Sequence, residues 1–221
     1  HKRNYRAVGS AAPIRETLAA AMISLTPWKE GRILIDPFCG SGTIPIEAAL
    51  KGMNIAPGLK RNFIAEEWGI IDKRLWQDSR EEAKALIKDD AQIIIQGYDI
   101  DERIIKVARD NARKAGVDGV IHFQQRDVAD LSSKDKYGFI VTNPPYGERL
   151  EDIKTVEELY RNMGKVFSRL DTWSFYILTA HEGFEKFFGR RANRKRKLYN
   201  GMMKTDFYQF FGPKPPINAA D

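Results

Sequence analysis

Short apolar runs alternate with amphipathic stretches along most of the chain. The apolar runs span residues 33–35, 93–99, 120–124, 139–142 and 174–178, and each has the length of a buried parallel strand. Helical patterns cover 11–25, 44–50, 102–114, 156–170 and a short stretch near 182–188. Strands that alternate with helices predict an α/β fold with a mostly parallel, doubly wound sheet.

Local signals set the expected ends of these elements. Ser10 is a plausible cap for the first helix and Pro13 suits its first turn, while Gly52 and Gly116 close the second and third helices. Asn200-Gly201 is a favourable hairpin dipeptide, with a further strand expected on each side. The sheet should therefore have seven strands, with a C-terminal antiparallel hairpin at one edge.

Residues 54–90 break the alternation. A Pro57-Gly58 turn and several aromatic residues precede a charged helix at about 77–87. We interpret this segment as an insertion into one domain that spans residues 1–215. A chain of 221 residues is long enough to bury one sizeable core.

Composition excludes several classes. There is no run of the roughly 18 apolar residues that a membrane helix needs, and the charged start has no signal-peptide core, so we expect a cytoplasmic protein without a membrane partner. Cys39 is the only cysteine and there are 3 histidines, so no metal site is expected.

The net charge of +6 favours a polyanionic partner. Six of the eight residues from 190 to 197 are basic: Arg190, Arg191, Arg194, Lys195, Arg196 and Lys197. Such a run either binds nucleic acid or is a solvated, charged edge strand that prevents aggregation, and the sequence leaves both open.

A glycine-rich loop follows the first strand. It reads Asp36-Pro37-Phe38-Cys39-Gly40-Ser41-Gly42-Thr43, and its glycines let a ligand approach the backbone while amides at the helix start face a carboxylate. No lysine follows Gly42, which excludes a Walker loop, and Pro45 stands where a dinucleotide fingerprint needs its third glycine. The loop instead resembles motif I of class I S-adenosylmethionine-dependent methyltransferases.

Polar residues at later strand ends fit the same ligand. Asp99 could accept hydrogen bonds from both ribose hydroxyls, and Asp127 from the adenine amino group. An aspartate at a strand end often only caps the next helix, but four such ends in succession form one ligand-facing rim. With their neighbours Ile100 and Val128, these residues and the loop from Asp36 to Thr43 make up the expected cofactor site.

The run Asn143-Pro144-Pro145-Tyr146 follows the fourth strand. The Asn143 amide oxygen and the Pro144 carbonyl could each accept one N–H of a planar amine, and Tyr146 could stack on its ring. These four residues are the expected catalytic set. The turn alone fits adenine in DNA, adenine or guanine in RNA, and a glutamine amide.

Across most of its length the chain resembles the methyltransferase domain of bacterial THUMP-containing RNA methylases, particularly the RlmL-type guanine 2-amino methyltransferases of 23S rRNA. Relatives of this type were once described as adenine-specific DNA methylases. The matching segments are residues 2–6, 12–20, 36–43, 57–68, 143–149 and 198–201. The resemblance implies S-adenosylmethionine as cofactor, S-adenosylhomocysteine as product, ribosomal RNA as partner, and a THUMP domain preceding these residues in a longer protein.

The resulting hypothesis is methyl transfer to the 2-amino group of a guanine in ribosomal RNA. Methylation of adenine N6 in DNA or RNA is the main alternative among enzymes. A non-catalytic RNA-binding module that has kept the fold is the alternative outside enzymes.

Overall fold

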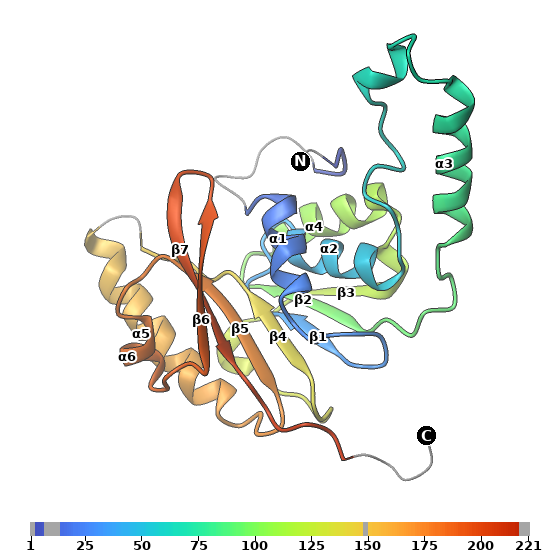
Figure 1. Ribbon diagram of the computed structural model, residues 1–221. Helices are drawn as coiled ribbons and strands as arrows, with labels where there is room; N and C mark the ends of the chain where they lie inside the picture. Colours follow the sequence, from blue (N-terminus) through green and yellow to red (C-terminus); the bar gives the residue numbers. More distant parts are fainter. Residues whose placement is uncertain (1–2, 7–13, 148–149, 217–221) are drawn as a thin grey trace.

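Seven strands form one sheet in the order β3-β2-β1-β4-β5-β7-β6 (Figure 1). The computed structural model describes residues 3–6, 14–147 and 150–216. The strands are β1 (Leu34–Asp36), β2 (Ile95–Asp99), β3 (Ile121–Gln125), β4 (Phe139–Thr142), β5 (Ser174–Thr179), β6 (Arg194–Asn200) and β7 (Met203–Phe210). The first five are parallel, whereas β7 runs antiparallel to β5 and β6 antiparallel to β7. The expected mixed sheet with its C-terminal hairpin is confirmed.

Helices cover both faces of the sheet. They are α1 (Glu16–Ser24), α2 (Thr43–Gly52), α3 (Lys73–Ala85), α4 (Glu102–Ala115), α5 (Leu150–Phe167) and α6 (Phe184–Phe188), with short 3-10 turns η1 (Ile64–Glu67), η2 (Asp118–Val120) and η3 (Val128–Asp130). Residues of α1, α2 and α4 share one apolar core with one face, and residues of α5 and α6 share a second core with the other. The sheet is therefore packed between two layers of helices.

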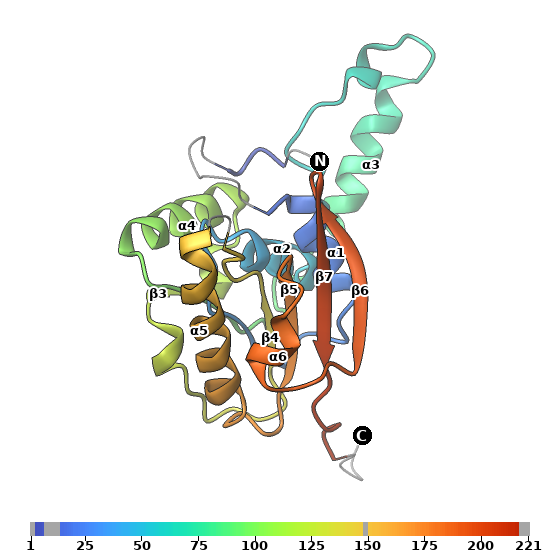
Figure 2. The same ribbon diagram turned by 90° about the vertical axis from the view of Figure 1, so that its left-hand side faces the viewer.

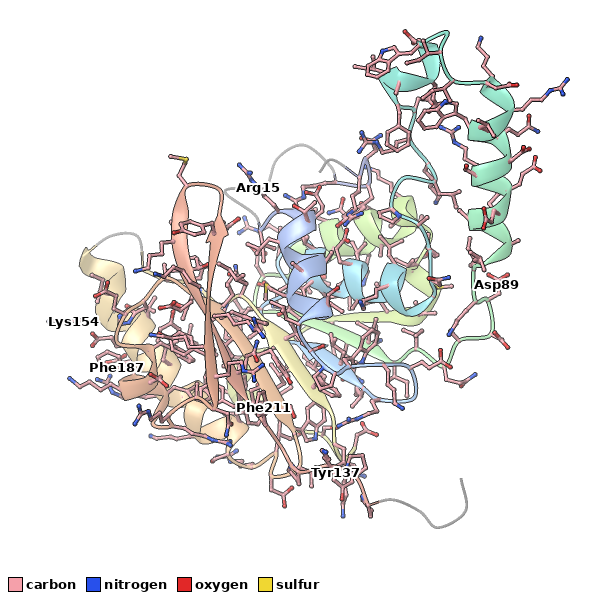
Figure 3. The ribbon with its side chains drawn as sticks, viewed as in Figure 1. Arg15, Asp89, Tyr137, Lys154, Phe187 and Phe211 are labelled. Carbon is pink, nitrogen blue, oxygen red and sulfur yellow. The ribbon has the colours of Figure 1, made fainter. Side chains whose placement is uncertain are left out.

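An arm formed by residues 54–87 leaves the body after α2 and returns before β2. It contains η1 and α3 and projects away from the sheet (Figures 1 and 2). Every residue of α3 is exposed or half-buried, and its side chains spread outward around the helix (Figure 3). The two ends of the arm meet where the amide of Lys88 donates to the carbonyl of Met53 at 2.9 Å.

Several element boundaries differ from the expectations, and three of the differences have a clear local cause. The charged helix of the arm begins at Lys73 rather than 77, because the Asp72 side chain caps it by accepting from the amide of Arg74 at 2.9 Å. Helix α5 begins at Leu150 rather than 156, and no glycine or proline in between interrupts it. Asn200 still pairs with Met203, so the hairpin loop is Gly201-Met202, with Gly201 at a φ of 66°.

The N-terminal helix starts later than expected. Helix α1 begins at Glu16, and the two described residues before it are not helical, because Arg15 is its extended N-cap. The expected helical span from residue 11 is therefore wrong at residues 14 and 15, while Ser10 and Pro13 lie outside the described residues.

Candidate active site

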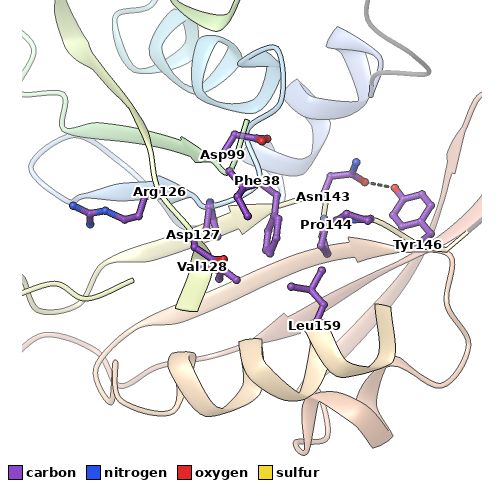
Figure 4. Close-up of a pocket in the computed structure, with 12 residues that line it drawn as sticks. Phe38, Asp99, Arg126, Asp127, Val128, Asn143, Pro144, Tyr146 and Leu159 are labelled. Carbon is purple, nitrogen blue, oxygen red and sulfur yellow. Dashed lines mark hydrogen bonds between the residues drawn. The ribbon is translucent and has the colours of Figure 1, made fainter. Parts of the chain in front are cut away.

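A cavity of about 420 Å³ opens at the carboxyl ends of the parallel strands (Figure 4). The polypeptide supplies its walls from the ends of β1 to β4 and from α5. The lining residues are Pro37, Phe38, Asp99, Ile100, Arg126, Asp127, Val128, Asn143, Pro144, Pro145, Tyr146 and Leu159. The fold thus brings Asp99, Asp127 and the Asn-Pro-Pro-Tyr turn to one cavity, as expected where parallel strands end together.

Asp99 links the second strand to the glycine-rich loop. One carboxylate oxygen accepts from the amide of Gly40 at 3.0 Å, and the other accepts from the amide of Asp101 at 3.0 Å. Each carboxylate oxygen can accept a second hydrogen bond. Asp99 therefore shapes the loop and still has acceptor capacity to offer a ligand.

Asp127 has two roles in the geometry. Its Oδ1 accepts from the amide of Ala129 at 2.8 Å, which caps the short η3 turn, and the residue also lines the cavity. Asp127 thus has the capping role expected of an isolated aspartate and still lines the cavity.

Asp36 lies beneath the cavity. Its side chain is buried, and its Oδ1 accepts from the Thr142 hydroxyl at 2.6 Å and from the amide of Phe38 at 3.1 Å. Burial, with a smaller contribution from nearby Asp99, raises the pKa of this carboxyl to about 7. Asp36 thus ties the end of β1 to the end of β4, the two strands from which the loop and the turn emerge.

Only the beginning of the rest of the loop reaches the cavity. Pro37 and Phe38 reach the lining, whereas Cys39, Gly40, Ser41, Gly42 and Thr43 are not among the described residues that line it. Gly42 has a φ of 85°, and a Cβ there would lie 3.0 Å from the Phe123 ring. A glycine is needed at this position for backbone conformation and packing as well as for any ligand. Burial raises the pKa of the Cys39 thiol, which argues against a nucleophile.

The loop is also held from outside. The Asn111 side chain donates to the carbonyl of Ser41 at 3.0 Å, and the Arg6 guanidinium donates to the Thr43 hydroxyl at 3.0 Å. These contacts fix both ends of the Ser41–Thr43 segment, so the start of α2 is pre-arranged before any ligand enters.

Two tyrosines hold the Asn-Pro-Pro-Tyr turn. The Tyr146 hydroxyl donates to the Asn143 side-chain oxygen within the turn (Figure 4). From α5, the Tyr160 hydroxyl donates to the carbonyl of Pro145 at 2.7 Å and lies 2.9 Å from the Thr179 hydroxyl at the end of β5. Burial raises the pKa of Tyr146 and Tyr160, so both hydroxyls remain donors at neutral pH.

Two lining residues were missed by the sequence reasoning. Arg126 lies with its guanidinium 4.5 Å from the centre of the Tyr98 ring and donates to the Gln124 side chain at 3.2 Å. Its position just before Asp127 could have indicated that it lies at the same end of the sheet. Leu159 belongs to α5 and contributes to the wall of the cavity. In the sequence, only its place in the helix next to Tyr160 could have indicated this.

The basic run lies elsewhere. Arg190 and Arg191 follow α6, while Arg194, Lys195, Arg196 and Lys197 belong to the edge strand β6, and all six are exposed. The Lys195 ammonium lies 3.5 Å from the Asp206 carboxylate and over the Tyr208 ring. Among the described residues that line the cavity, this run contributes none.

Within the described part of the chain, no group of three or more His, Cys, Asp or Glu residues is arranged to hold a metal ion. The helices of that part are also too short or too polar to cross a bilayer.

Comparisons with known proteins agree with this geometry. The chain is 50% identical over 216 residues to "Putative RNA methyltransferase YpsC" of Bacillus subtilis, covering 98% of the chain and 56% of that protein. It is 38% identical over 213 residues to the ribosomal RNA large subunit methyltransferase K/L of Shewanella baltica, covering 94% of the chain and 30% of that protein. The chain therefore spans about half, or less, of the length of these relatives.

A solved structure is similar throughout. The crystal structure of SMU.472 in complex with S-adenosylhomocysteine superimposes with a TM-score of 0.92 at 47% identity, covering 97% of this chain and 56% of that one. The model of the RMKL-like methyltransferase domain family (UPF0020) matches residues 3–209. The resemblance seen in the sequence is confirmed: this chain belongs to the RMKL-like methyltransferase domain family.

Proposed function

We propose that this chain transfers a methyl group from S-adenosylmethionine to the exocyclic 2-amino group of a guanine in ribosomal RNA. The observation that carries the proposal is the single cavity shared by Asp99, Asp127 and the turn from Asn143 to Tyr146. A donor site and an amine socket that open into one space are what direct methyl transfer requires. The K/L relative, which is a ribosomal RNA methyltransferase by name, supports RNA as the acceptor.

The residues present fit the cofactor. Phe38, Ile100 and Val128 give the cavity apolar walls on which an adenine can pack, and Asp99 and Asp127 provide acceptors for the ribose hydroxyls and the adenine amine. Gly40, with a φ of 51° and open space where a Cβ would stand, leaves its backbone open to close approach. The structure of SMU.472 with S-adenosylhomocysteine supports this assignment.

The cofactor supplies a methyl group on a positively charged sulfur, which leaves as a thioether. The amine of guanine is a weak nucleophile because its lone pair is delocalised into the ring. Asn143 Oδ1 can accept a second hydrogen bond besides that from Tyr146, and the Pro144 carbonyl can accept another. These two acceptors direct the lone pair at the methyl carbon and stabilise positive charge as it develops on nitrogen, and the displaced proton passes to water.

Adenine is the second candidate acceptor. Its N6 amine is also planar, and the turn offers the same two acceptors to either base. Ribosomal RNA prepared from cells that lack the gene can be incubated with the purified protein and labelled cofactor, then digested to nucleosides. Label in N2-methylguanine supports the proposal, whereas label in N6-methyladenine supports the alternative.

Asn143→Ala tests the catalytic role of the turn. We expect turnover to fall at least about 100-fold, as when a positioned polar group of a transition-state site is removed, with cofactor affinity near that of the wild type. Asn62→Ala, an exposed asparagine of the arm, is the matched control and should remain active. A fully active Asn143→Ala variant would refute the role.

Calorimetry separates the enzyme from a binding module. Detectable binding of S-adenosylmethionine by the wild-type chain is expected. No binding at millimolar cofactor would instead favour an RNA-binding module that has kept the fold.

The organisation of the longer protein belongs to the same proposal. We infer that residues 1–215 form the methyltransferase domain and that a THUMP domain encoded before them captures the RNA. Ribosomal RNA as the acceptor also implies a cytoplasmic enzyme.

A further inference from the structure

The register of the C-terminal hairpin divides the basic run. Arg194 pairs with Gln209, which pairs with Tyr176 near the middle of β5. Lys197 pairs with Asp206, which pairs with Thr179, the last residue of β5. The run from Arg190 thus begins toward the edge of the sheet opposite the cavity, and only its last residue reaches the carboxyl edge.

Beyond Lys197 the hairpin extends past the rest of the sheet. Strand β5 ends at Thr179, so the last three pairs of the hairpin extend beyond it. These pairs are Leu198–Thr205, Tyr199–Lys204 and Asn200–Met203. Three rows at about 3.4 Å each place the end of the hairpin roughly 10 Å beyond that strand. We call residues 198–205 the hairpin tip, and Figures 1 and 2 show it rising past the ends of β4 and β5.

The hairpin tip stands beside the acceptor half of the cavity. The Asn-Pro-Pro-Tyr turn follows β4, and β4 and β7 are separated in the sheet by β5 alone. Neighbouring strands lie about 4.8 Å apart, so the two strands are roughly 10 Å apart. An RNA strand that places one base at Asn143 and continues toward β7 would reach the hairpin tip within a few nucleotides.

One face of the hairpin tip points to the side of the sheet covered by α5. Tyr208 packs in the core with α5 and α6, and the alternation of side chains along β7 puts Asp206 and Lys204 on that face. Their partners Lys197 and Tyr199 share it. Helix α5 begins just after the Asn-Pro-Pro-Tyr turn, so this face looks toward the exit of the turn.

The face combines an exposed ring with cations. Tyr199 is 60% exposed and Met202, at the loop, is 99% exposed. Lys197 and Lys204 are also exposed, and the nearby Asp206 is paired with Lys195. A ring and a methionine in water beside exposed lysines match the bases and phosphates of a single strand.

We propose that the hairpin tip and the adjoining Lys197 bind single-stranded RNA next to the target nucleotide, with a base stacked on Tyr199 and phosphates at Lys197 and Lys204. This rests on the proposed function, because it assumes an RNA acceptor. It relocates the nucleic-acid surface from the whole basic run to its end and to residues that follow it.

The first test measures binding of a short fluorescein-labelled single-stranded RNA by fluorescence anisotropy. Tyr199→Ala should weaken binding roughly ten-fold, the effect of losing one stacked base, while Tyr199→Phe should bind almost like the wild type. Thermal melting of both variants checks that the hairpin stays folded. Equal binding by wild type and Tyr199→Ala, or no binding by the wild type, would overturn the proposal.

The second test compares the two ends of the run at equal charge. The double variant Lys197→Gln, Lys204→Gln should lower the salt dependence of binding by about 1.4 in log–log slope, for two phosphate contacts on a single strand. Arg191→Gln, Arg194→Gln removes the same charge away from the cavity and should change the slope much less. An equal or larger change of slope in this second double variant would indicate that the RNA lies along the whole strand, and it would refute the proposal.

Cofactor affinity separates this proposal from the proposed function. Calorimetry with S-adenosylhomocysteine should give the same affinity for every hairpin variant as for the wild type. If the cofactor binds and RNA binding ignores the hairpin tip, only the present inference fails. If the wild type binds no cofactor, the proposed function fails, whatever the RNA result.

Discussion

The hydroxyl of Tyr160 in α5 donates a hydrogen bond of 2.7 Å to the carbonyl oxygen of Pro145 in the Asn-Pro-Pro-Tyr turn. The same hydroxyl lies 2.9 Å from the Thr179 hydroxyl, which accepts from the amide of His181. The turn is therefore connected through one buried tyrosine to the end of β5. The position of Asn143 depends on this connection, because only Pro144 separates it from Pro145.

Replacing Tyr160 by Phe should slow methyl transfer with little effect on cofactor binding. The Pro145 carbonyl loses its donor, at a cost of about 1–3 kcal/mol for a buried acceptor, and the turn loosens. We expect kcat to fall roughly ten-fold while the dissociation constant of S-adenosylhomocysteine, measured by calorimetry, stays the same. Tyr208→Phe, which removes a hydroxyl from the same core, is the control. Equal losses of kcat in both variants would indicate general destabilisation instead.

Asp99→Asn should weaken cofactor binding. An amide keeps one acceptor oxygen, so either the Gly40 or the Asp101 contact is lost, and ribose hydroxyls lose a charged acceptor. Hydrogen bonds to charged groups contribute about 1.5–3 kcal/mol, which predicts a roughly 10- to 100-fold rise in the dissociation constant. Asp101→Asn, at the cap of α4 outside the cavity lining, should bind cofactor normally. Unchanged affinity in Asp99→Asn would contradict the assigned ribose contact.

Gly42→Ala should destabilise the fold even without ligand. Its left-handed backbone costs a non-glycine residue about 1–3 kcal/mol, and the new methyl would contact Phe123 at 3.0 Å and Ala108 at 3.1 Å. Gly40→Ala, with a φ of 51° and open space around the added carbon, should lose only the backbone contribution. Urea unfolding should rank the free energies of unfolding as wild type, Gly40→Ala, Gly42→Ala. The opposite order would mean that packing at Phe123 relaxes at no cost.

Asp36→Asn should remove a pH dependence of stability. Burial raises the pKa of the Asp36 carboxyl from 3.8 to about 7, so between these values the folded state holds a proton that the unfolded chain has lost. The free energy of unfolding of the wild type therefore falls as pH rises from about 4 to about 7, by up to about 1.4 kcal/mol per pH unit, and levels off above. Asparagine retains both hydrogen bonds, since both go to Oδ1.

Urea unfolding across that pH range measures the difference between the two proteins. The advantage of Asp36→Asn over the wild type should grow toward neutral pH. Asp118→Asn, an exposed aspartate, should follow the wild-type curve. Parallel curves for wild type and Asp36→Asn would show that the buried carboxyl is ionised throughout.

The central strands β1, β4 and β5 could be predicted because they are buried on both sides. Continuous apolar runs such as residues 139–142 have one interpretation in an α/β chain, and β4 has the expected bounds. The start of α5 was harder to predict. Residues 150–155 include several charged side chains, and they carry no capping signal. The hairpin loop shifted by one residue because pairing across the strands, not the dipeptide alone, sets the register.

The sequence could predict which strand ends contribute to the site, but not which of their side chains face the cavity. Strand-end position brought Asp99, Asp127 and Asn143 to one cavity, as parallel topology dictates. Whether a strand-end acid faces the cavity or the sheet below depends on its neighbours, and Thr142 draws Asp36 inward. The sequence likewise could not show that a run of cations lies along a strand that leads away from the cavity.

The contact between Met53 and Lys88 has a consequence for how this molecule can change. The arm leaves and returns beside this backbone hydrogen bond, and Lys60 Nζ fastens its beginning to the body by donating to the carbonyl of Ala115 at 3.1 Å. Residues can therefore be exchanged in the part of the arm that lies between Lys60 and Lys88 while the strand ends stay in place. The chain thus contains a natural graft site, where the outer part of the arm can be replaced and the methyltransferase core inherited unaltered.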